Sequence, residues 1–170
     1  MSCLITGGFA YGCRDSVAGI KAIYIANYNE NQTYTLDSAN VITAVGITSP
    51  ADAYYTYFQN PETAMFDQTL NASNGAVFYK QSLTLQFPKN GNALKNLIVT
   101  LNQARLSVIV KDASDNYWLM GVHSGVYSTS GSLNSGKVLG DFNGVNLVLE
   151  ANDPSPAYKI DDINLFDIVE

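Results

Sequence analysis

Hydrophobic and polar residues alternate along most of this chain, which is the pattern of β-strands with one buried face. The clearest example is residues 76–87 (AVFYKQSLTLQF), where Leu83, Leu85 and Phe87 are separated by polar residues. β-Branched and aromatic residues mark the other strong candidates. Further strands are predicted at residues 19–27, 32–36, 41–47, 53–58, 63–70, 106–111, 117–122, 145–150 and 158–169.

Turn signals between these segments predict how the strands connect. The QNPE sequence at residues 59–62 is expected to join the strands on either side of it into a pair. Asn-Gly occurs at residues 74–75 and again at 143–144, and the second occurrence is the strongest two-residue hairpin signal, because both residues tolerate positive φ. The Gly- and Ser-rich residues 124–136 are expected to form a loop.

One segment departs from the β pattern. Between Asn92 and Arg105 apolar residues recur at helical spacing, with polar residues on the opposite side. This predicts one amphipathic α-helix over about residues 92–104, N-capped by Asn90 or Asn92. Together with the strands, it predicts one mainly β domain over residues 1–170, an antiparallel β-barrel or sandwich, in which residues 1–18 form an extended N-terminal arm.

Composition adds that the surface is polar but poorly charged. Charged residues are 14% of the chain, against roughly 25% in a usual soluble domain, and the chain has 11 Tyr and one Trp. Such a surface is typical of proteins that meet other protein, although secreted β-proteins share it. The net charge of −6 lies entirely beyond residue 140. A negative field argues against binding a nucleic-acid backbone, and an acidic end also simply aids solubility.

The N-terminal residues and the spacing of the two cysteines predict that the protein is made in a cytoplasm. The first residues, MSCLITGGFAYGCR, have no Lys or Arg before a short apolar stretch that Gly-Gly interrupts, which is not the pattern of a secretion signal. No run of about 18 apolar residues predicts a membrane span. Cys3 and Cys13 match no zinc or redox spacing and are expected to be reduced thiols.

Catalytic patterns are largely missing from the sequence, which predicts no enzyme, no cofactor and no metal. His123 is the only histidine, no Gly-x-Ser-x-Gly motif accompanies it, and a histidine at the rim is favoured over a triad. Asp161 and Asp162 are adjacent, so in a strand they would point to opposite faces. Residues 141–144 (DFNG) resemble the start of a calcium loop but lack its later ligands.

The C-terminal half resembles the tail tube proteins of long-tailed bacteriophages. Residues 13–28 also resemble small virion proteins of phages that infect Bacteroidetes-type hosts, whereas residues 50–81 match no known pattern. The motifs that carry the first likeness are WLMG at 118–121, the Ser/Gly-rich segment 128–136, GDFNG at 140–144, the alternating strand 145–149 and Pro-Ala at 156–157.

The resemblance implies a structural virion protein of the tail, made in the host cytoplasm. Such proteins form stacked rings, usually hexameric, with inner strands joined into a barrel around a channel for DNA. The implied partners are copies of this chain and other tail proteins, with DNA only as non-specific passing cargo. An acidic channel would repel the DNA backbone and let it slide, and the candidate lumen acids are Glu150, Asp161 and Asp162.

Assembly also suggests a use for the N-terminal arm. Residues 2–18 would order against a neighbouring subunit, with Arg14 and Asp15 pairing across the joint; alternatively, the arm folds over its own domain and both charges are solvated. Aromatic crowding at residues 54–58 suits an interface, although a core role is an equal alternative. The candidate interface residues are Phe9, Tyr11, Arg14, Asp15, Tyr54, Tyr55 and Tyr57.

Two other functions stay open. The first is another virion component, such as a capsid decoration or tail-completion protein, which would bind an existing shell or form one closed ring. The second is a Tyr-rich β-sandwich that binds carbohydrate, since sugar sites stack rings on tyrosine. A soluble monomer with measurable affinity for a glycan would favour this last interpretation.

Overall fold

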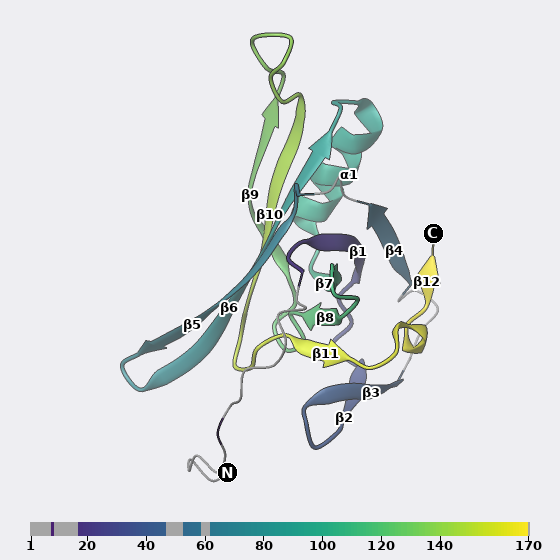
Figure 1. Cartoon of the computed structure of the whole chain (residues 1–170), viewed down its shortest axis with the longest axis vertical. Helices are drawn as coiled ribbons and strands as arrows, with labels where there is room; N and C mark the ends of the chain where they lie inside the picture. Colours follow the sequence, from purple (N-terminus) through teal and green to yellow (C-terminus); the bar gives the residue numbers. More distant parts are fainter. Residues whose placement is uncertain (1–7, 9–16, 47–52, 59–61, 170) are drawn as a thin grey trace.

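Figure 1 shows the fold, taken from a computed structural model that describes residues 8, 17–46, 53–58 and 62–169. The elements are β1 Ile20–Asn27, β2 Thr33–Leu36, β3 Val41–Gly46, β4 Tyr54–Phe58, β5 Met65–Ser73, β6 Ala76–Pro88, α1 Asn92–Gln103, β7 Leu106–Asp112, β8 Tyr117–Met120, β9 Tyr127–Asn134, β10 Gly144–Asp153, β11 Tyr158–Ile160, the 3-10 turn η1 Ile163–Leu165 and β12 Ile168–Val169.

The described strands form two sheets. Sheet A has the order β12-β4-β1-β7-β8-β11-β3-β2, and sheet B has the order β5-β6-β10-β9. All pairings are antiparallel except the two short ones of β3 with β11 and of β4 with β12. Both sheets are open and pack as a sandwich, so of the two predicted architectures the structure has the sandwich and not the closed barrel. The mainly β class and the single α-helix among the described residues are confirmed.

The main core lies between the two sheets. Alternate residues of β6 and β10 point into it, among them Leu85 and Leu147, and they meet Val108 of β7 on the facing side. The helix α1 covers the same face of sheet B with Ile98 and Leu101. The alternation predicted for these strands therefore marks the core face correctly, because side chains in a strand point to opposite sides in turn.

A second core lies on the other face of sheet A. Ile42, Ile109 and Phe166 are buried there together with Tyr54. The ring of Phe166 meets that of Tyr54 edge-on at 5.3 Å between centroids, and the Tyr54 hydroxyl lies 2.8 Å from Ser107 Oγ. The C-terminal segment, with η1 and β12, thus closes over this face and gives sheet A a core that does not depend on sheet B.

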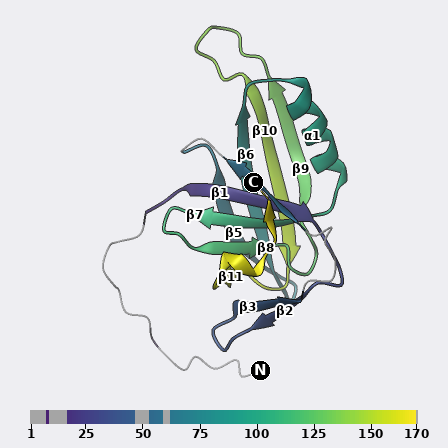
Figure 2. The ribbon, with the colours of Figure 1, turned by 90° about the vertical axis from the view of Figure 1, so that its right-hand side faces the viewer.

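Sheet B extends beyond the body of the molecule at both ends (Figure 1), and Figure 2 shows the end at the β9–β10 connection from another side. At one end β5 and β6 turn through Asn74 and Gly75, which both have positive φ, of 51° and 81°, as the Asn-Gly signal predicts. At the other end, residues 135–143 connect β9 to β10. Gly144 pairs with Pro88 at that second end, whereas Ser73 pairs with Ala76 at the first.

Three predicted connections are wrong. The strands on either side of residues 59–62 do not pair: β4 lies in sheet A beside β1, and β5 lies in sheet B beside β6. The chain crosses between layers here because Tyr54 is buried in the core of sheet A while Phe66 packs into the core between the sheets. Residues 124–136 are not all loop, since most of them form strand β9.

The second Asn-Gly pair is also not a two-residue hairpin. Gly144 is the first residue of β10, and a Cβ there would overlap the carbonyl oxygen of Phe87, so the glycine allows close approach of two strands instead of a turn. The helix is N-capped by Gly91 without a side-chain bond, because Asn90 donates instead to Asn134 O and Asn143 Oδ1. The predicted strand 158–169 is interrupted by η1.

Truncation of Leu147, which is fully buried in β10, tests the core between the sheets. We expect Leu147→Ala to lower the free energy of unfolding by about 2–5 kcal/mol, because it leaves a cavity in a packed interior. The matched control is Leu133→Ala in β9, whose side chain is 61% exposed and should change stability by no more than about 0.5 kcal/mol. Equal effects in urea unfolding would contradict this core assignment.

Candidate functional site

The outer strands of sheet B are the longest of the mostly exposed strands among the described residues, and they form our candidate site. β5 has nine residues and β9 has eight, and within the described chain neither pairs with a second strand on its outer side. The outer strands of sheet A, β12 and β2, have only two and four residues. We call the unpaired sides of β5 and β9 the open edges.

The open edges have few of the features that usually protect a sheet edge: β5 has one charge, and β9 has one register shift against β10. Proteins prevent unwanted pairing with short edge strands, prolines or charged side chains, lysine above all. β5 (MFDQTLNAS) contains only Asp67 as a charge, and β9 (YSTSGSLN) has no charge and no proline. Each strand therefore offers a long row of backbone N–H and C=O groups to a further strand.

Strand direction decides what such a further strand can be. Sheet B is antiparallel throughout and has four strands, so β5 and β9 run in opposite directions. When a second copy lies beside the first in the same orientation, its β5 runs antiparallel to β9 of the first. The open edges are thus complementary to each other without any inversion of the second copy.

The face of sheet B that points away from the core is polar. Thr84 and Gln86 of β6 and Asn146 of β10 alternate with the core residues, and Gln86 Nε2 donates to Asn146 Oδ1 at 3.1 Å. Lys80 and Glu150 form an ion pair of 2.9 Å on the same face. This surface, which we call the polar face, is therefore covered mainly by uncharged hydrogen-bonding groups.

The structure does not bring the three candidate lumen acids together. Glu150 lies on the polar face and is paired with Lys80. Asp161 and Asp162 instead follow β11, an inner strand of sheet A, and Asp162 Oδ1 accepts from Asn164 N at 2.9 Å and caps η1. They are not strand residues, so the prediction that they point to opposite faces of a strand is wrong.

The candidate interface tyrosines have three different surroundings. Tyr54 is buried beside Phe166, so it is a core residue and its predicted role at an interface is not supported. Tyr55 is exposed, and Tyr57 is half-buried with its ring against Phe87. Burial raises the pKa of the Tyr57 phenol, and nearby Tyr55 adds to the effect. Phe9, Tyr11, Arg14 and Asp15 lie outside the described residues.

The arrangement closest to a catalytic triad is His123, Ser124 and Asp153. Asp153 is buried, and its carboxylate accepts from the backbone N–H groups of His123 and Ser124 and from the Ser124 hydroxyl. The imidazole of His123 lies against the ring of Tyr158 instead, with 6.4 Å between centroids. Because a triad needs the imidazole between hydroxyl and carboxylate, this cluster has the wrong order and serves to hold a turn.

Two further side chains hold the same turn from its other side. Arg105 Nε donates to Ser124 O at 2.7 Å, and Tyr28 OH donates to His123 O at 2.9 Å. The Arg105 guanidinium also lies 4.0 Å over the Tyr28 ring and forms an ion pair with Glu30. Sequence spacing does not reveal this network, because its members come from β10, from the segments that follow β1 and β8, and from the residues just before β7.

Other kinds of site are not found among the described residues. They include no group of three or more His, Cys, Asp or Glu side chains placed to hold a metal ion, and no helix long and apolar enough to cross a bilayer. Asp141 of the calcium-like motif accepts from Lys137 N and Val138 N, so its carboxylate stabilises a turn. Comparison of the chain with protein-family models, with curated proteins and with solved structures finds no match.

The structural role of the buried carboxylate gives a test. We expect Asp153→Asn to lower the free energy of unfolding by about 1–3 kcal/mol, because His123 N and Ser124 N donate to different carboxylate oxygens and the new NH2 group must face one of these two donors. Asp161→Asn, at an exposed site, serves as the control and should stay within about 0.5 kcal/mol. An Asp153→Asn protein as stable as wild type in urea unfolding would show that this carboxylate does not hold the turn.

Proposed function

We propose that this chain is the repeating subunit of a bacteriophage tail tube, a structural virion protein made in the host cytoplasm. One observation carries the proposal: sheet B ends on two long, weakly protected edges that run in opposite directions. The resemblance of the C-terminal half to tail tube proteins supports it independently, through motifs that lie in β8, β9 and β10 and in the segments that follow them.

Edge pairing would join copies into a closed ring. β9 of one copy pairs with β5 of the next, each copy adds four antiparallel strands, and closure removes every open edge of sheet B. The contact is heterologous, so it repeats around a ring without any change in subunit orientation. We propose six copies, the usual number in the family that the sequence resembles, with other tail proteins at the ends of the tube.

The thickness of the subunit favours the polar face as the inner wall. Sheet A and α1 both pack on the core face of sheet B, and the residues of the polar face belong to neither core of the described chain. When such subunits form a ring, the side that carries sheet A and α1 is thicker than sheet B and therefore has to lie on the outside, where the circumference is larger. The polar face would then line a channel, and the second core and the C-terminal segment would lie outside.

The chemistry of the polar face suits passing DNA. Serine, threonine, asparagine and glutamine dominate it, and the lysine that it contributes, Lys80, is neutralised by Glu150. DNA binds protein tightly when cations replace its counterions. A wall without unpaired cations and with the extra negative charge of Asp67 offers no such exchange. Asp161 and Asp162 would not belong to this wall.

The second candidate function is carbohydrate binding, and a groove lined by aromatic side chains supports it. Tyr28, Tyr34, His123 and Tyr158, together with Glu30, line a hollow of about 440 Å³. Aromatic rings beside polar side chains are the usual lining of small-ligand sites. A monomer whose glycan affinity is lost in Tyr158→Ala would support this function over the tube.

Electron microscopy tests the first proposal directly. Negative-stain images of the purified chain at low and high concentration should show rings or hollow tubes of uniform width. Sedimentation velocity should show a concentration-dependent species with a fixed number of copies. A monomer at every concentration, also after addition of preformed tail ends, would contradict the proposal.

A lysine placed on one open edge tests the pairing itself. Ser130 of β9 and Thr84 of β6 flank Val148 in one row across sheet B. We expect Ser130→Lys to weaken each contact between β9 and β5 of neighbouring copies by about 0.2–1 kcal/mol, because lysine opposes strand addition at an edge. The same loss occurs at every such contact in the ring, so the losses add. Thr84→Lys puts the same charge on the same face of a central strand and is the matched control. Equal association of both variants in sedimentation would contradict edge pairing.

A further inference from the structure

The loop between β9 and β10 presents two apolar side chains at one end of the molecule. Val138 is 66% exposed and Leu139 is fully exposed. The loop is nevertheless held in shape: Asp141 Oδ2 accepts from Lys137 N at 2.8 Å and Val138 N at 3.0 Å, and Asp141 N donates to Val138 O. We call residues 137–141 the tip. Leucine and valine held open to water in an ordered loop indicate a missing contact.

The opposite end of sheet B carries a second exposed apolar surface. Leu70 and Val77 are 56% and 57% exposed, although the register places them on the core side of the β5–β6 hairpin. The last contacts between the core side of this hairpin and the body are those of Gln68 with Ala157 N and of Gln81 with Gly121 N and Ser155 O. Beyond them the apolar side continues, and no element of the described residues covers it; we call Leu70, Ala72 and Val77 the hairpin face.

One copy cannot bring these two surfaces together. The tip follows the end of β10 at Gly144, and the hairpin face lies next to the turn at Asn74 and Gly75, at the far end of the same sheet. Figure 1 shows the two projecting from opposite ends of the molecule. A translation of a second copy along the strands, without inversion, moves its tip toward the hairpin of the first.

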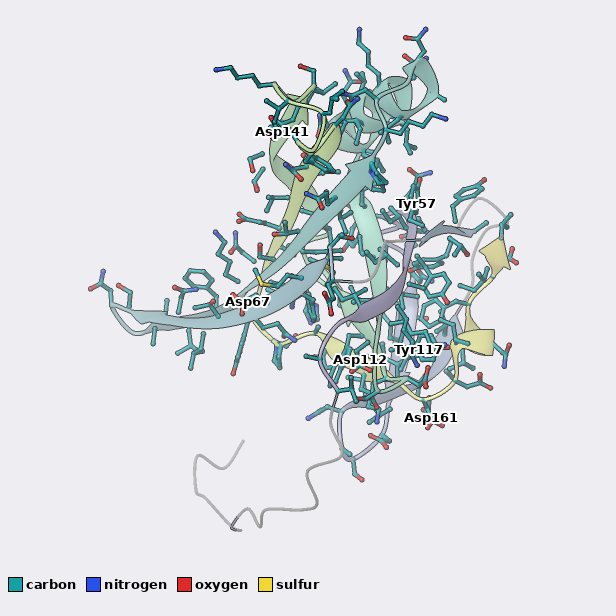
Figure 3. All side chains as sticks on the ribbon, turned by 45° about the horizontal axis from the view of Figure 1, so that its top comes forward. Tyr57, Asp67, Asp112, Tyr117, Asp141 and Asp161 are labelled. Carbon is teal, nitrogen blue, oxygen red and sulfur yellow. The ribbon has the colours of Figure 1, made fainter. Side chains whose placement is uncertain are left out.

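Charge on the two ends supports this head-to-tail approach. The end with the tip carries three lysines, Lys137, Lys89 before α1 and Lys95 in its first turn, against one acid, Asp141, and the first turn of α1 has no acidic residue to offset its positive dipole. At the far part of the molecule, beside sheet A, Asp37 in the turn between β2 and β3 and the pair at 161–162 outnumber Lys159 of β11. Figure 3 shows Asp141 and Asp161 at opposite ends.

We propose that the tip of one copy docks on the hairpin face of a second copy, so that Val138 and Leu139 cover Leu70 and Val77. This contact rests on the proposed function, since it stacks the rings that edge pairing forms. It is heterologous and leaves a free tip and a free hairpin face at the two ends, so it extends a tube indefinitely.

The size of the surface explains why stacking should follow ring formation. Two apolar side chains on each partner give a weak contact for a single pair of copies. A ring presents the same contact once per copy, and linked weak contacts add to a much stronger one. Single copies therefore stay apart along the axis, whereas closed rings stack.

A double substitution on the tip separates stacking from ring formation. Val138→Ser with Leu139→Ser should leave closed rings intact in negative stain and raise the concentration needed for tubes by about tenfold or more. Val99→Ser, at a 48% exposed position of α1, is the control and should stack as wild type does. Normal tubes from the double variant would overturn the tip contact only. Absence of rings from the wild-type protein would overturn the proposed function, and the stacking contact with it.

Photo-crosslinking identifies the partner surface of the tip. With p-benzoylphenylalanine at position 139, irradiated tubes should yield an intermolecular crosslink to a peptide that contains residues 70–79. The same probe at position 99 should not reach that peptide. A crosslink from position 139 to other parts of the chain, or none at all in intact tubes, would overturn the proposal.

Discussion

Unpaired backbone groups along β5 and β9 are the constraint on which the rest of this account depends. A single chain can satisfy the hydrogen bonds of its central strands, but sheet B leaves two long edges on which side chains bond to only single backbone groups, such as Thr69 O and Asn134 O. Most proteins protect such edges strongly, whereas this chain has one charge in β5 and one register shift in β9. Because the two edges run in opposite directions, the simplest partner for each is the other edge of a second copy, and a ring satisfies all of them at once.

The two hydrophobic cores stabilise the two sheets differently. Sheet A has its own interior, closed by Phe166 against Tyr54, so its stability does not rest on sheet B alone. Sheet B shares only one face with that body and can therefore run past it at both ends, toward the tip and toward the β5–β6 hairpin. The same extension that exposes backbone at the sides exposes apolar side chains at the ends, which gives one subunit a lateral and an axial surface.

The sequence predicts well what depends on local pattern and poorly what depends on strand order. Alternation identifies the core face of β6 and β10, helical spacing identifies α1, and Asn74-Gly75 identifies its hairpin. β9 is missed because its Ser- and Gly-rich residues have no apolar alternation and gain their place from backbone pairing with β10. The pairing expected across residues 59–62 fails because burial of Tyr54 in a separate core outweighs nearness in sequence. Open edges are invisible in sequence, since they depend on which strands end outermost.

Hydrogen exchange followed by mass spectrometry tests the central claim most directly, since it reports on the edge backbone itself. Exchange should be compared between the dilute chain and its assembled form. The account predicts strong new protection in peptides that cover residues 65–73 and 127–134, while the exposed edge strand of sheet A at residues 33–36 exchanges as before. Assembly without new protection of β5 and β9 would contradict edge pairing as the basis of this structure.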